Sequence, residues 1–74
     1  MTEIGVEQIK VLSDQNRLAI LSLLAIREMT TTAISDLLGL SVQNAQYHIK
    51  KLLEAGLIVP TRTELVGNLV EKYY

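Results

Sequence analysis

The sequence predicts a small, mainly α-helical domain with a β-hairpin at its C-terminal end. Leucine, isoleucine and valine recur at helical spacing up to Gly56. Two glycines, Gly39 and Gly56, follow apolar segments at the place where helices commonly end. After Gly56, β-branched residues lie at close spacing around the Gly67-Asn68 pair, which is typical of a hairpin turn. The chain of 74 residues has room for one domain, so we expect residues 1–74 to form a single unit.

Two helices are expected at the start of the chain. Ile4, Val6, Ile9 and Leu12 predict a short first helix whose apolar side faces the rest of the domain. Ser13 and Asp14 offer N-cap oxygens for a second helix, from about residue 14 to residue 27. We expect this second helix to be covered on several sides, because its apolar side chains point in nearly every direction. They are Leu18, Ile20, Leu21, Leu23, Leu24 and Ile26.

A tight turn between two helices is predicted next. Residues 29–32 favour a brief extended segment, and Thr30 or Thr31 would cap a third helix that Gly39 ends. The apolar stripe of this helix is Ala33, Ile34, Leu37 and Leu38. Only Leu40 separates Gly39 from the next N-cap, Ser41, so the two helices must cross steeply, as they do in a helix-turn-helix.

The fourth helix is expected at about residues 42–55, and Gly56 ends it. The hairpin follows at about residues 57–74, where Pro60 is tolerated only at a sheet edge. The predicted order is therefore α-α-β-α-α-β-β. A hairpin appended to a helix-turn-helix is a winged helix-turn-helix.

A helical wheel divides the fourth helix into two sides. Its inner side, predicted to face the core, consists of Val42, Ala45, Ile49, Leu52 and Leu53. Its outer side contains Gln43, Tyr47, Lys50, Lys51 and Glu54, with Asn44 close by and Gln46 and His48 on the flanks. The first two turns contain no carboxylate, and their amides could bond base edges in a major groove. The same residues would also suit an ordinary solvated helix face.

Three segments of the chain resemble the ArsR-type winged-helix transcriptional regulators: "LSDQNRLAILSLL", "LLGLSVQNAQYHIKKLLEAGLI" and "NLVEKYY". The resemblance implies sequence-specific binding of double-stranded DNA as a transcriptional regulator, by a homodimer. A cytoplasmic location is expected because the chain has no cysteine and no start typical of a secretory signal. It also implies that the recognition-helix contacts are Ser41, Gln43, Asn44, Gln46 and Tyr47. Lys50 and Lys51 are placed to meet the phosphate backbone, and His48 matches a flank histidine that we expect to be half-buried, structural and hydrogen-bonded to the backbone. Asp14 and Arg17 match the start of the second helix, where a cap or a local ion pair is expected.

Two departures from this family shape the expectations. Its metal sensors carry cysteines before the third helix, where this chain has Thr30, Thr31 and Thr32. With no cysteine and one histidine, no metal or other cofactor is expected. The family dimerises through helices at both ends, so the chain is either the N-terminal domain of a longer regulator or pairs by its first helix alone. A start at Met1 and an end inside a strand favour the longer protein.

The predicted wing is almost neutral. Arg62 is the candidate for a phosphate or minor-groove contact, but Glu64 and Glu71 offset Arg62 and Lys72. The alternative is a hairpin that completes the core through Leu57, Ile58, Leu69 and Tyr73.

The net charge of −1 supports a second function, a winged-helix module that binds protein through Tyr47, Tyr73 and Tyr74. An enzyme is not expected, because the lone histidine has no nucleophile to activate. No membrane span is expected either, since the longest apolar run, residues 18–26, is short.

Overall fold

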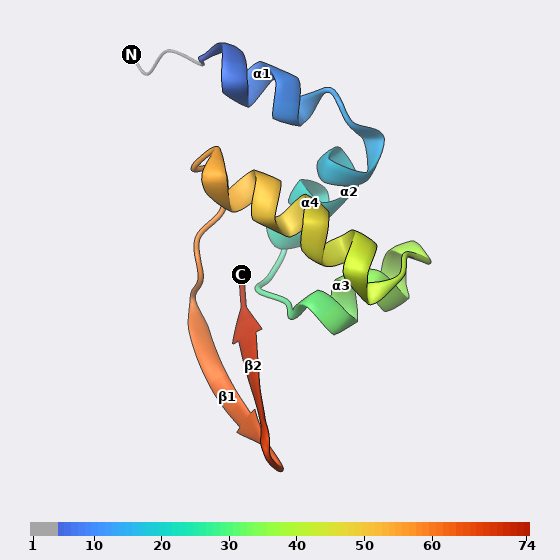
Figure 1. Ribbon diagram of the computed structural model, residues 1–74, viewed down its shortest axis with the longest axis vertical. Coiled ribbons are helices and arrows are strands. Elements are labelled where there is room, and N and C mark those ends of the chain that lie inside the picture. Colours follow the sequence, from blue (N-terminus) through green and yellow to red (C-terminus); the bar gives the residue numbers. More distant parts are fainter. Residues whose placement is uncertain (1–4) are drawn as a thin grey trace.

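The computed structural model describes residues 5–74, and Ile4, expected in the first helix, lies outside them. Four helices precede a two-stranded antiparallel hairpin (Figure 1). The helices are α1 (Val6–Leu12), α2 (Gln15–Leu24), α3 (Thr31–Leu38) and α4 (Val42–Glu54), and the strands are β1 (Arg62–Val66) and β2 (Leu69–Tyr73). The extended segment before α3 is a single bridge between Thr30 and Tyr73. The winged helix-turn-helix fold is therefore confirmed.

Three of the helices have an N-cap residue whose side chain accepts hydrogen bonds from the first turn. Each cap stabilises its helix because it satisfies backbone N–H groups that have no partner within the helix. Asp14 accepts hydrogen bonds from the N–H groups of Asn16 and Arg17 at the start of α2. Thr30 caps α3, and Ser41 caps α4. Gly39 ends α3 with a φ of 66°, the left-handed conformation that the predicted tight turn requires.

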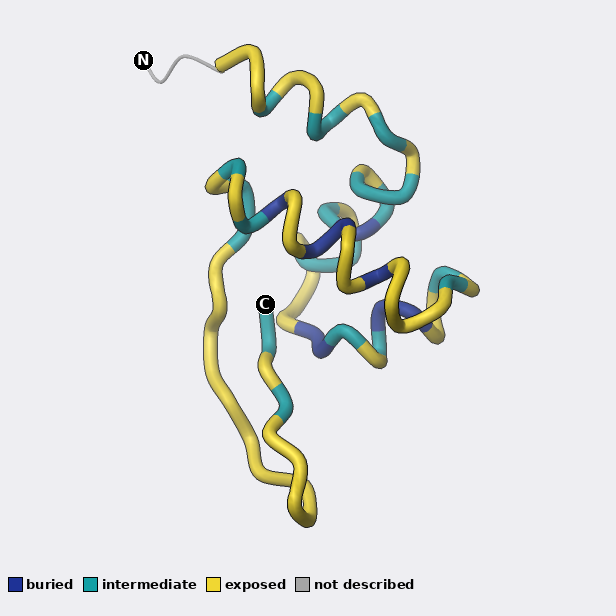
Figure 2. Tube along the Cα trace, viewed as in Figure 1, coloured by how far each residue is buried: buried dark blue, intermediate teal, exposed yellow. Residues whose placement is uncertain are grey.

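The core lies where α2, α3 and α4 meet (Figure 2). It contains Ile20, Met29, Ile34, Ala45, Ile49 and Leu52. The prediction that α2 reaches Arg27 was wrong, because the backbone tightens after Leu24: Ile26 N–H bonds the carbonyl of Leu23, three residues back. Ile26 is consequently 81% exposed.

Other apolar residues expected in the core are exposed. Val6 and Ile9 on α1 have exposed fractions of 68% and 57%, because this helix lies at one end of the molecule and reaches the core only through Val11 (Figure 1). Leu18, Leu37 and Val42 are exposed as well. Nothing in the described chain covers the outer sides of these short helices, so the expected apolar stripes are only partly buried.

The wing projects away from the helices (Figure 1). Val66 pairs with Leu69 across the two-residue turn, and Gly67 has a φ of 64° while Asn68 does not have a positive φ, as in a type II′ turn. Leu57 and Ile58 pack against the core as predicted, and Tyr73 is half-buried. Leu69 does not pack against the core, because it lies far along the projecting hairpin. It is 70% exposed.

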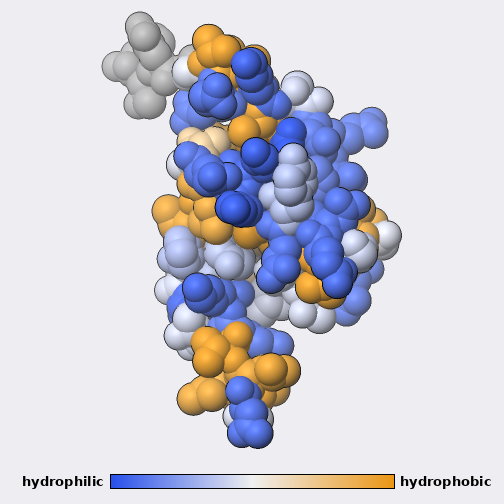
Figure 3. Space-filling model, in the orientation of Figure 1, coloured by the Kyte–Doolittle hydropathy of each residue, from blue (hydrophilic) through white to orange (hydrophobic). Residues whose placement is uncertain are grey.

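The end of the hairpin carries an exposed apolar cluster, which we call the wing tip. It consists of Leu65, Val66, Leu69 and Val70, whose exposed fractions range from 53% to 75% (Figure 3). None of the helices within residues 5–74 has the length and apolar character needed to cross a bilayer.

Candidate nucleic-acid interface

Seven of the eight predicted site residues lie together on α4 and its N-cap. All are exposed, and we call this surface the recognition face. It consists of Ser41, Gln43, Asn44, Gln46, Tyr47, Lys50 and Lys51. Arg62, the eighth, lies on β1.

The opposite side of α4 holds the helix in place. Ala45, Ile49 and Leu52 are at most 2% exposed, so they anchor α4 against α2 and α3. The spacing of these residues is that of one helical stripe, and their burial turns the amides of Gln43 and Asn44 outward. Ser41 Oγ accepts a hydrogen bond of 3.0 Å from Asn44 N–H, which fixes the first turn.

Tyr47 stands near the middle of the recognition face and is 54% exposed. Its ring packs edge-to-face against the His48 ring, with 5.4 Å between centroids. Lys51 Nζ lies 5.6 Å from the centroid of the Tyr47 ring, within the range of a cation–π contact. The face therefore combines mixed donor and acceptor groups with an aromatic ring and two cations.

The prediction for His48 was wrong in two respects. This side chain is buried rather than half-buried, with 6% exposed. Its Nδ1 lies 3.4 Å from Nη1 of Arg17, so its partner is a side chain and not the backbone. Arg17, expected at most in a local ion pair, instead reaches across to α4; the 31-residue separation gave no local signal for this contact.

Arg62 is already bound by carboxylates. Its Nε lies 2.5 Å from Glu28 Oε1, its Nη1 contacts Glu64, and its guanidinium carbon lies 3.7 Å from the centroid of the Tyr73 ring. Two hydrogen bonds lower the pKa of the Glu28 carboxyl, and the bond from Thr61 has a larger effect than the bond from Arg62. The bond with Glu28 in turn raises the pKa of Arg62 above its ordinary value. At neutral pH, the wing cation thus faces charges of its own chain.

Two shallow grooves border the recognition face. One, of about 400 Å³, lies between α4 and the wing, and Gln46, Thr31 and Lys72 are among its lining residues. The other, of about 390 Å³, includes Gln43, Lys50 and Tyr74. Polar and apolar side chains line both grooves, and the first also includes the carboxylate of Glu71.

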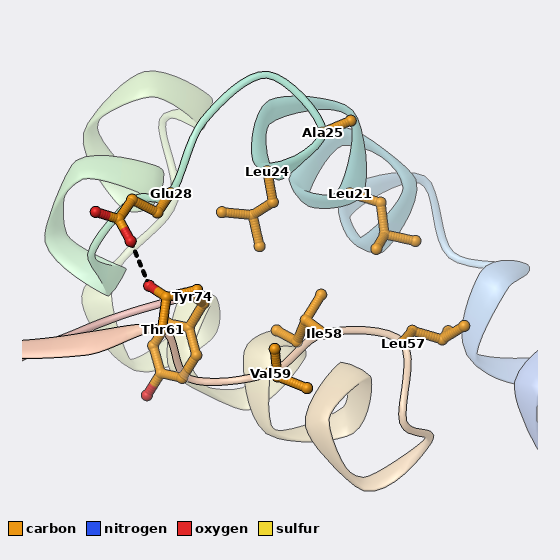
Figure 4. Close-up of a pocket in the computed structure, with 9 residues that line it drawn as sticks. All are labelled: Leu21, Leu24, Ala25, Glu28, Leu57, Ile58, Val59, Thr61 and Tyr74. Carbon is orange, nitrogen blue, oxygen red and sulfur yellow. Dashed lines mark hydrogen bonds between the residues drawn. The ribbon is translucent and has the colours of Figure 1, made fainter.

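A third groove, of about 370 Å³, is apolar and lies between α2 and residues 57–61 (Figure 4). Leu21, Leu24 and Ile58 point into it, and its one carboxylate, Glu28, is bonded by Thr61. It brings together no nucleophile, base and orienting group. Within the described residues, no group of three or more potential metal ligands occurs.

A family model described as a helix-turn-helix domain matches residues 12–61. The chain belongs to the helix-turn-helix domain family. The match includes α2, α3 and α4 and ends one residue before β1 begins. Within this helix-turn-helix domain, Gly39 and Leu40 form the turn, and α4 is the second helix of the motif. Among curated proteins, no match to this chain was found.

Membership supports DNA as the partner of this helix-turn-helix domain. In such motifs the second helix enters the major groove with its N-terminal residues against base edges. The surface of α4 that is free to do so is the recognition face.

Proposed function

We propose that this helix-turn-helix domain binds double-stranded DNA sequence-specifically, as a transcriptional regulator of the ArsR type. The observation that carries the proposal is the division of α4 into a buried apolar side and an exposed side of amides, tyrosine and lysines.

The amides would select the bases. Gln43 and Asn44 carry both a donor and an acceptor, and the amide of Asn or Gln can form two hydrogen bonds with adenine in the major groove. Both side chains lie in the first turn of α4, the part that reaches deepest into the groove. Tyr47, one turn later, is placed for a thymine methyl group or a phosphate.

The cations would provide the attraction to the backbone. Lys50 and Lys51 follow the amides along α4, and the hydroxyl of Ser41 lies at the N-terminus of the helix, where phosphates are favoured. With so few cations in each copy, we expect weak binding by one copy and a modest loss of affinity with salt. Two copies on a palindromic site would strengthen the binding, which is the reason for proposing a homodimer.

The test is selection from random duplex DNA at near-physiological salt, followed by titration of the selected duplex. We expect Gln43→Ala and Tyr47→Ala each to weaken binding, with a cost of about 1–3 kcal/mol for a lost bidentate base contact. Gln15→Ala, at an exposed glutamine that begins α2, is the matched control and should bind normally. Equal affinities of the wild type and all three variants for the selected duplex would contradict the assignment of the recognition face.

The wing tip supports a second candidate, a module that binds protein. Tyr73 and Tyr74, which this candidate expects a partner to cover, are half-buried by the chain itself. Four aliphatic side chains are exposed at the wing tip instead. This candidate predicts that no duplex is enriched above background in the same selection.

A further inference from the structure

Arg17 joins three parts of the described chain. Its backbone N–H lies 3.2 Å from Oδ1 of Asp14, within the N-cap of α2. Its Nε donates to the carbonyl oxygen of Val11, in the last turn of α1, over 2.7 Å. Its Nη1 lies 3.4 Å from Nδ1 of His48 on α4. The backbone of this residue therefore bonds the N-cap of α2, while its side chain contacts the end of α1 and the middle of the recognition helix.

The contact with Arg17 sets the role of one imidazole nitrogen of His48. A guanidinium group only donates hydrogen bonds, so in this hydrogen bond Nδ1 accepts and carries no proton. Since only 6% of His48 is exposed, water has little access to replace Arg17 as the partner.

The His48 ring in turn contacts the recognition face. It packs edge-to-face against the Tyr47 ring, with an angle of 69° between the ring planes. Tyr47 is half exposed, so its inner edge rests on His48 while its outer edge is free. A change in the imidazole would therefore change the direction of an aromatic side chain proposed to contact DNA.

We infer that Arg17 is a positioning residue for DNA recognition, which acts through His48 on Tyr47 without contacting the DNA. Because Nε of Arg17 also holds Val11, the end of α1 becomes part of the same arrangement. A second bond, from Gln8 Nε2 to the carbonyl of Ala55 over 3.1 Å, ties α1 to the C-terminal end of α4. The effect on affinity rests on the proposed function, whereas the placement of Tyr47 does not.

The test uses a substitution that conserves charge. Arg17→Lys keeps the cation but lacks the fixed fork that reaches Val11 and His48 at once. Arg27→Lys makes the same change at an exposed arginine and is the matched control. In the DNA-free protein, we expect Arg17→Lys to shift the NMR signals of the Tyr47 ring and the imidazole nitrogens of His48. It should also raise the Kd for the selected duplex by about three- to thirtyfold, and Arg27→Lys should do neither.

Two results would overturn the inference. One is a set of Tyr47 signals that is the same in Arg17→Lys as in Arg27→Lys. The other is a shift of these signals with no greater rise in Kd than in the control. If the wild-type chain selects no duplex, the proposed function fails, and the NMR comparison alone decides the placement of Tyr47. If Arg17→Lys does not fold, the inference is tested on the wild-type protein by the NMR shifts of the His48 imidazole nitrogens. These shifts must show Nδ1 without a proton, and a proton on Nδ1 contradicts the inference.

Discussion

Glu28 and Arg62 face each other at the root of the wing, 34 residues apart in sequence, with 2.5 Å between Oε1 and Nε. Thr61 donates to the other oxygen of the same carboxylate. The connection between α2 and α3 therefore supplies one of the two carboxylates that bind this wing arginine, and Glu64 supplies the other.

Removal of the Glu28 charge should free Nε of Arg62 for a phosphate, while Nη1 keeps its contact with Glu64. We expect Glu28→Gln to bind duplex DNA more tightly than the wild-type chain, and its affinity to fall more steeply with salt. One additional phosphate contact makes the slope of log K against log salt steeper by about 0.9. The measurement is a titration at several salt concentrations. Asp36→Asn removes the same charge from α3 without releasing an arginine, so an equal slope in both variants would show that Arg62 stays away from DNA.

The turn between α3 and α4 depends on Gly39. An alanine there would have to adopt a φ of 66°, at a cost of about 1–2 kcal/mol for a side chain in the left-handed region. We therefore expect Gly39→Ala to lower the free energy of unfolding in urea by about that amount. Gly5→Ala is the control, since Gly5 has a φ of −75° and, among residues 5–74, an added Cβ would meet only Gln8 Oε1, at 4.0 Å. Equal stability of the two variants would contradict this account of the turn.

Acid should destabilise the fold through two carboxylates. The hydrogen bond from Arg17 N–H, with smaller help from Asn16 N–H, lowers the pKa of Asp14 in the folded chain. Bonds from Thr61 and Arg62 lower the pKa of Glu28 in the same way. A carboxyl whose pKa is lower in the folded than in the unfolded chain stabilises the fold above its unfolded pKa. That stability is lost as the pH falls through the folded pKa.

We accordingly expect the Tm, followed by circular dichroism, to drop between neutral pH and a pH below about 4, the ordinary carboxyl range. Asp14→Asn should have a lower Tm at neutral pH and a smaller drop in acid. Asp36→Asn, at an exposed aspartate that caps no helix, should behave as the wild type. If acid lowered the Tm of Asp14→Asn by as much as that of the wild type, the Asp14 cap would not contribute to the pH dependence of stability.

Two apolar residues of α3 should differ widely in their effect on stability. Ile34 is completely buried, whereas Leu37 is 59% exposed. We expect Ile34→Ala to cost about 2–5 kcal/mol, because it removes buried methyl groups and leaves a cavity. Leu37→Ala should cost less than about 1 kcal/mol, because most of its side chain already lies in water. Urea unfolding of both variants measures the difference, and similar costs would mean that Leu37 is covered in solution.

Features set by nearby residues could be predicted from the sequence. The caps at Asp14, Thr30 and Ser41 and the left-handed Gly39 depend on a few neighbouring residues. The buried stripe of α4 follows from the helical repeat, since residues at this spacing share one side wherever the helix lies. These local rules also produced the order of elements, and with it the winged helix-turn-helix fold.

Features that depend on distant parts of the chain were missed. Whether Leu37 or Ile9 is buried depends on what lies over it, which helical spacing does not specify. The partners of His48 and Arg62 come from 31 and 34 residues away, respectively. The role of the recognition face stays a prediction, since the exposure of its side chains is compatible with any partner that offers hydrogen bonds.

The division of α4 into two sides has a consequence for how such a chain could diversify. Ala45, Ile49 and Leu52 keep the helix in place, while Gln43, Asn44 and Gln46 are exposed. Single substitutions at these outward positions should leave the scaffold intact, because the residues that hold the helix in place are not the ones that face outward. New target preferences could therefore arise one codon at a time, with a folded protein at every intermediate, and a library randomised at these three positions would retain mostly folded members.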